Sequence, residues 1–123
     1  MNNTAPKSVV IDGVEYFQKP KIDETKNPYV IVRADRAGVF VGNLVSRTDS
    51  GSFSTVVMSN CRRVFYWDGA ASISQLALTG TSKPKNCKFP APIDNHTIMG
   101  VIEILPVTEQ ARQSIEAVQI WQA

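Results

Sequence analysis

The sequence predicts an α+β fold with a mainly antiparallel sheet of four to five strands and two short helices. Short β-prone runs follow one another closely through the middle of the chain, and connections of hairpin length join antiparallel neighbours only. Two helical segments come singly after strands, one beginning near Ser72 and one near Thr108. The length of 123 residues and a hydrophobic content of 43% fit a globular domain with one core.

The first 27 residues are expected to form an appendage and a linker. The dipeptide Asp12-Gly13 lies between two β-prone runs and is typical of a β-hairpin over residues 8–17. The following residues are polar and contain Pro20, which favours a linker. The predicted organisation is therefore residues 1–27, hairpin and linker, and residues 28–123, a single α+β domain.

Five apolar runs predict the strands of this domain. The expected strands are residues 29–32, 39–46, 53–58, 64–67 and 98–105. Turn-forming clusters rich in Gly, Asp and Ser separate the first three, so we expect these in meander order. Ser59-Asn60-Cys61 is expected to break the third strand from the fourth, and Pro106 to close the last.

Both predicted helices have recognisable ends. Ser72 begins a Ser-x-x-Gln capping box, and Gly80 is the residue type that ends a helix in the left-handed conformation. Thr108 is expected to cap a second helix that runs to about Ala117. Residues 81–94 contain three prolines and are expected to form a long surface loop that includes no regular element over most of its length.

Composition and motifs exclude several function classes. A net charge of +2 does not favour nucleic-acid binding, although nucleic-acid binding stays an alternative hypothesis. The chain begins with a polar segment and carries no apolar run long enough for a membrane, so we expect a cytoplasmic protein. Cys61 and Cys87 form no Cys-x-x-Cys motif and are expected to be reduced.

The inventory of catalytic groups is poor. His96 is the one histidine and is expected in a loop. The sequence contains no motif of a hydrolase, a metalloprotease or a P-loop nucleoside triphosphatase. A triad of Ser72, His96 and an aspartate stays open, as does a metal set of Cys61, Cys87, Asp94 and His96, but neither has a characteristic spacing. We therefore predict no catalytic residue, no metal and no cofactor.

Arginines beside aromatic residues mark the candidate site. Along a strand over residues 62–67, side chains alternate, so each face would carry one arginine and at least one ring, a pairing suited to phosphate and base. The free amides of a helix beginning after Ser72 would favour an anion there. The competing interpretation is a structural role in core and sheet edge. The predicted ligand-binding residues are Arg33, Arg36, Phe40, Arg62, Arg63, Tyr66, Trp67 and Ser72.

These segments carry a family resemblance. The chain from Tyr29 to Trp121 resembles a family of small tailed-phage and prophage proteins, and the name of that family implies no activity. The matching residues are 29–33, 37–42, 60–77, 87–89, 102–109 and Trp121. A second likeness is to phage anti-defence sponges of the Thoeris anti-defence type, small oligomeric proteins that hide cyclic nucleotide signals without cleaving them. It rests on size, phage origin and the arginine-aromatic surface, and no sponge residue is carried over.

The expected function is therefore non-enzymatic binding. The resemblance implies a phage-encoded homo-oligomer in the host cytoplasm that sequesters a phosphate-containing small molecule such as a cyclic nucleotide. One alternative is an interaction module that docks on a host or phage protein through the N-terminal hairpin. Others are a protein that binds nucleic acid weakly and an enzyme acting on nucleotides through His96.

Overall fold

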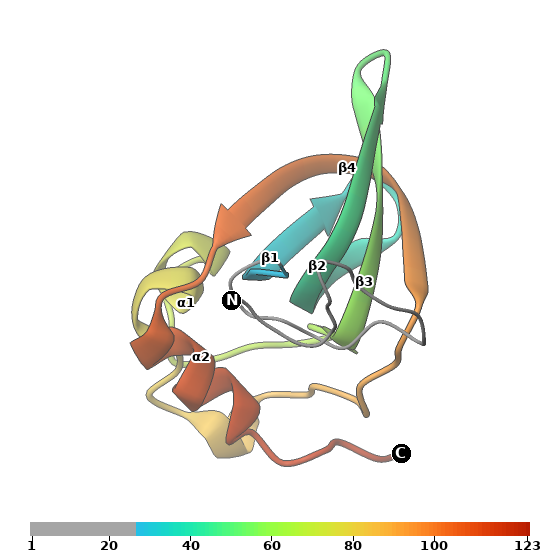
Figure 1. The fold of residues 1–123 in the computed structure, drawn as a ribbon. Coiled ribbons are helices and arrows are strands. Elements are labelled where there is room, and N and C mark those ends of the chain that lie inside the picture. The colour runs from blue at the N-terminus through green and yellow to red at the C-terminus, as the bar shows by residue number, and fades with distance from the viewer. Residues whose placement is uncertain (1–26) are drawn as a thin grey trace, which may run out of the picture.

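The computed structural model describes residues 27–123 and shows four strands closed into a small barrel, with helices packed at its side (Figure 1). The elements are β1 (Tyr29–Ala34), β2 (Gly38–Ser50), β3 (Phe53–Arg63), α1 (Ile73–Thr79), the 3₁₀ turn η2 (Pro84–Asn86), β4 (His96–Pro106) and α2 (Glu109–Glu116). The predicted α+β class with an antiparallel sheet is confirmed. The hairpin expected over residues 8–17 lies outside the described residues.

Antiparallel pairing closes the sheet on itself. β1 pairs with both β2 and β4, and β3 pairs with the same two strands. The β2–β3 register shifts twice, between Val41 and Asn43 and between Leu44 and Ser46, and the β1–β4 register shifts after Arg33. Such bulges bend a strand and increase its twist, which is what allows so few strands to close.

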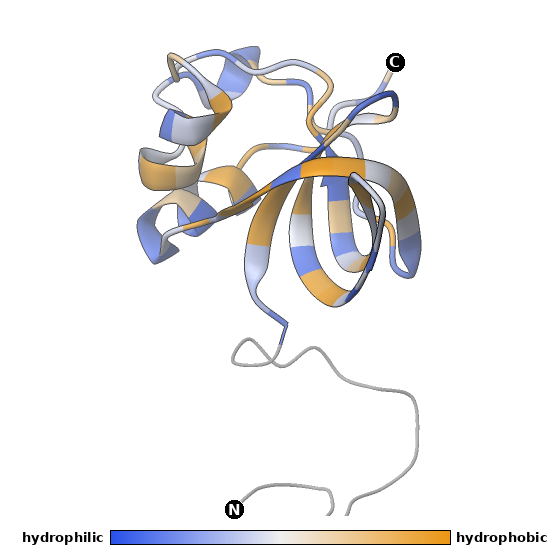
Figure 2. Ribbon diagram, turned by 90° about the horizontal axis from the view of Figure 1, so that it is seen from above, coloured by the Kyte–Doolittle hydropathy of each residue, from blue (hydrophilic) through white to orange (hydrophobic). Residues whose placement is uncertain are grey.

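The core has two parts, divided by β1. Val30 and Val32 point into the barrel, whereas Tyr29 and Ile31 point toward the helices, as the two-residue alternation of a strand requires. Both faces of β1 are therefore buried, which explains its continuous apolar run. Figure 2 shows both helices gathered on one side of the barrel, and hydrophobic and hydrophilic residues alternating along its strands.

The two helices begin and end where the sequence predicts. The Ser72 hydroxyl accepts a hydrogen bond from the Gln75 amide at 3.3 Å, and Gly80 follows α1 with φ of 78°. The Thr108 hydroxyl accepts from the Ala111 amide at 3.1 Å and caps α2. It also donates to a carbonyl of α1, Leu78 O, at 2.7 Å, so one side chain ties the two helices together.

Three expectations about strands are wrong. β3 does not break at Ser59–Cys61 but continues to Arg63, because Asn60 adopts φ of 52° within the strand. Residues 64–67 consequently leave the barrel. Val64 N still donates to Val39 O of β2 at 2.8 Å, and beyond it Tyr66 forms an isolated bridge with Lys88. His96, expected in a loop, begins β4.

Candidate functional site

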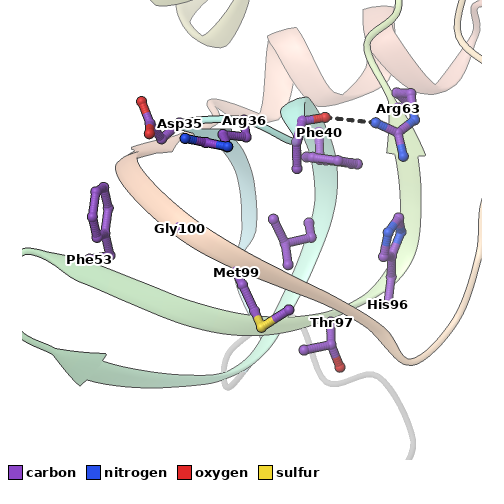
Figure 3. Close-up of a pocket in the computed structure, with 11 residues that line it drawn as sticks. Asp35, Arg36, Phe40, Phe53, Arg63, His96, Thr97, Met99 and Gly100 are labelled. Carbon is purple, nitrogen blue, oxygen red and sulfur yellow. Dashed lines mark hydrogen bonds between the residues drawn. The ribbon is translucent and has the colours of Figure 1, made fainter.

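A pocket of about 540 Å³ lies beside the β1–β2 turn, and we call it the turn pocket (Figure 3). The turn contributes residues 35–37, β2 contributes Phe40, the two ends of β3 contribute Phe53 and Arg63, and β4 contributes residues 96–100. Antiparallel closure of the barrel brings these segments together, although residues 36 and 96 are far apart in the chain.

The wall of the turn pocket carries two guanidinium groups. Arg63 donates a hydrogen bond from Nη1 to the Ala37 carbonyl at 2.8 Å, and its guanidinium carbon lies 4.5 Å from the centre of the Phe40 ring. Within residues 27–123 the exposed guanidinium of Arg36 has no ion-pair or hydrogen-bond partner. Asp35 lines the pocket as well, so the ionised side chains there sum to one positive charge when His96 is neutral.

His96 contributes a buried ring nitrogen without a hydrogen-bond partner in the described residues. Its ring lies edge-on to Phe40, with ring centroids 5.1 Å apart and planes at 80°. The buried Nδ1 atom has no hydrogen-bond partner within the described part of the chain. Burial, and then the positive charge of Arg63, lower the pKa of His96, which keeps the imidazole neutral at neutral pH. A buried nitrogen without a partner is costly, so a polar atom placed against Nδ1 would be stabilised.

Three of the predicted ligand-binding residues meet in the turn pocket: Arg36, Phe40 and Arg63. Phe40 is only 1% exposed, so its ring supports Arg63 and His96 instead of offering a free face to a base. The exposed ring of this pocket is Phe53, of which 44% is accessible. In the view of Figure 3, Phe53 and His96 lie toward opposite ends of the pocket.

Arg62 has a different environment from its neighbour Arg63. It is 5% exposed, and its guanidinium donates to five backbone carbonyls, those of Phe89, Pro90, Ile115, Val118 and Gln119. These bonds join β3 to the loop before β4 and to the end of α2. We therefore assign Arg62 to the fold, because its donors are already occupied by the chain.

The four remaining predicted residues are dispersed. Arg33 pairs with Glu103 across β1 and β4, with Nε and Oε1 2.8 Å apart. Trp67 packs half-buried against the helix-side core. Ser72 caps α1, and Tyr66 is exposed beside Lys88. The exit of the chain from the barrel after Arg63 removes the strand that would have aligned Tyr66 and Trp67 with the arginines.

Sequence reasoning missed several residues of the pocket. The sequence predicts Phe53 as the first residue of a strand and His96 as a loop residue or a base, but both line the pocket. Asp35 and Met99 were given no role. His96 and Thr97 are both polar and Ile98 and Met99 are both apolar, so no alternation of residue types signals the earlier start of β4. The meeting of these segments has no local signal.

Within residues 27–123 no group of three or more His, Cys, Asp or Glu side chains is close enough to hold a metal ion. Cys61 and Cys87 are buried free thiols. No helix in this described part has the length and apolar character needed to cross a membrane.

Comparison with known proteins places the chain in a family. No curated protein and no solved structure shows a significant match. A family described as a domain of unknown function, DUF6948, matches residues 27–115, which include every strand, α1 and most of α2. Because this match spans most of the sequence, the chain belongs to the DUF6948 family.

Proposed function

We propose that the protein is a non-enzymatic binding protein that sequesters a phosphate-containing small molecule of nucleotide size in the turn pocket. The observation that carries the proposal is the pair of arginines on one pocket, Arg36 without a partner and Arg63 held in place against Phe40. A volume of about 540 Å³ falls within the ordinary range for small-molecule sites.

Each part of such a ligand has a complementary group. Arginine presents a planar fork of donors that matches phosphate oxygens, and Arg36 can supply this fork without breaking an existing bond. The exposed Phe53 ring offers a face for a base. Asp35 can accept a hydrogen bond from a sugar hydroxyl.

The biological role extends the proposal on the strength of the resemblance to phage proteins. In this role the chain is encoded by a phage, acts in the host cytoplasm, and removes a cyclic nucleotide immune signal by stoichiometric binding. Release of an unchanged ligand after denaturation distinguishes this activity from hydrolysis. The absence of cleavage is tested directly by mass spectrometry of the nucleotide before and after incubation with the protein.

Isothermal titration calorimetry with a panel of cyclic mononucleotides, cyclic dinucleotides and adenosine diphosphate ribose tests the binding. A hydrogen bond to a charged group contributes roughly 1.5–3 kcal/mol, so Arg36→Ala is expected to weaken binding about tenfold or more. The matched control is Arg47→Ala, because Arg47 is an exposed arginine on β2 that pairs with Asp49 and does not line the pocket. Equal binding by both variants would refute the assignment of the pocket.

A further inference from the structure

A second surface, separate from the turn pocket, is formed by three short segments that lie side by side. Residues 65–66 pair with Lys88 through backbone bonds, with Lys88 N donating to Tyr66 O at 2.8 Å. Residues 120–121 pair with Phe89 on the other side, with Trp121 N donating to Phe89 O at 3.0 Å. We call the side chains of Phe65, Tyr66, Lys88 and the half-buried Trp121 the aromatic platform.

Two rings of the aromatic platform are exposed, and the third, that of Trp121, is half-buried. Phe65 is 60% exposed and Tyr66 51% exposed. Phe65 stacks on Trp121, with centroids 5.5 Å apart and planes at 11°. The Lys88 ammonium lies 6.0 Å from the centre of the Tyr66 ring and 5.5 Å from that of Trp121. Exposed large rings on a chain of this size indicate a contact surface.

Two lysines bring positive charge to the platform. Neither Lys85 nor Lys88 forms an ion pair within the described residues. Lys85 lines a pocket of about 410 Å³ together with Trp121, so a second cation borders the rings. The acid of this region, Asp68, already accepts hydrogen bonds from the Asn86 amide side chain and the Gly69 amide.

We propose that the aromatic platform binds single-stranded nucleic acid. Unpaired bases stack on the faces of Tyr66 and the Phe65–Trp121 pair, while Lys85 and Lys88 neutralise phosphates. A duplex would hide the base faces that the rings require. A purely apolar partner would bury the Lys88 ammonium without a counter-charge, which is unfavourable, whereas a phosphodiester supplies that charge.

This inference goes beyond the small-ligand function and can fail independently of it. The platform and the turn pocket share no lining residue. The two sites therefore have separate variants, Tyr66→Ala for the platform and Arg36→Ala for the pocket.

Fluorescence anisotropy with a labelled oligothymidylate of about ten nucleotides, a length within the known range of such sites, tests the inference. With two phosphate contacts, the logarithm of the association constant should fall with the logarithm of salt concentration with a slope of about −1.4. Lys85→Ala should reduce this slope by about 0.7. Tyr66→Ala should weaken binding about tenfold and leave the slope unchanged, whereas Tyr66→Phe keeps the ring and should retain affinity.

Control variants test whether the oligonucleotide binds at the aromatic platform. Phe53→Ala removes another exposed ring, one that lines the turn pocket, and should bind the oligonucleotide as the unsubstituted protein does. Loss of binding in Phe53→Ala with retention in Tyr66→Ala would overturn the proposal. So would an unsubstituted protein that binds no oligonucleotide, or one that prefers a duplex of equal length. A dimer that Tyr66→Ala converts to a monomer, without oligonucleotide binding, would assign the surface to a second copy instead.

Discussion

Replacement of Arg62 by methionine tests whether this side chain belongs to the fold or to a ligand site. Methionine keeps a long apolar stem and removes the guanidinium. The carbonyls of Phe89, Val118 and three further residues then lose their donor. The substitution leaves every lining residue of the turn pocket in place, so its effects on stability and on binding can be measured separately.

The magnitude follows from the two shortest bonds. Arg62 Nη2 donates to Phe89 O at 2.7 Å, and Nη1 donates to Val118 O at 2.9 Å. A hydrogen bond to a charged group contributes roughly 1.5–3 kcal/mol, so their loss alone costs about 3–6 kcal/mol. The bonds to Pro90 and Gln119 are only part-buried, and water can replace them. At about 4 °C or more per kcal/mol for a domain of this size, the midpoint of thermal unfolding should fall by about 12 °C or more.

Urea denaturation followed by far-ultraviolet circular dichroism, together with thermal scans, measures the change. Arg33→Met is the matched control, because Arg33 also lies on a strand and forms an ion pair, but with 48% of its side chain exposed. An exposed pair of this kind contributes about 0–1 kcal/mol. The reasoning is refuted if Arg62→Met unfolds at the same urea concentration as the unsubstituted protein. If Arg62→Met loses nucleotide binding without losing stability, Arg62 belongs to the ligand site.

Three other substitutions or conditions probe the core and the pocket. Gly42→Ala would place a Cβ 2.7 Å from Asn60 O and 2.8 Å from Cys61 Cα, so it should destabilise the barrel by about 2 kcal/mol; an unchanged urea midpoint would contradict this. Because the pKa of His96 is lowered by folding from its ordinary value of 6.5, the unfolded chain takes up the proton first, and stability should fall as the pH drops below 6.5. His96→Gln should make the free energy of unfolding less dependent on pH below 6.5. The same pH dependence in this variant and the unsubstituted protein would contradict the role of His96. Burial raises the pKa of Cys61 to about 12, so native protein should resist iodoacetamide at this thiol at pH 8, and rapid labelling would show that the site opens.

Local signals in the sequence were sufficient for the helices and most strands. The Ser72 and Thr108 caps are interactions across three residues, and Gly80 acts within its own turn. Such contacts form wherever the chain is helical, so residue type and spacing predict them. The prediction of a strand at 64–67 is wrong for two reasons. The apolar side chains of these residues make contacts outside the barrel, and Asn60 continues the strand that it was expected to break.

The candidate site could be predicted in part only. Arg36, Phe40 and Arg63 were named from residue type, and the structure brings them together, while Arg62 looked equivalent to Arg63 in sequence. Adjacent residues on a strand point to opposite sides, so one guanidinium enters the interior and the other reaches the pocket. Which guanidinium is buried depends on the packing of α2 and the residues that follow it, because the carbonyls of Ile115 and Val118 accept hydrogen bonds from Arg62.

The sequence by itself determined the α+β class, the antiparallel pairing and the ends of both helices, since these depend on apolar alternation, short connections and caps within a few residues of one another. The tertiary structure decided the closure of the barrel, the buried role of Arg62 and the meeting of His96 and Phe53 with the β1–β2 turn. These features depend on bulges and on contacts between residues far apart in the chain, and no local pattern of residues specifies where such segments meet.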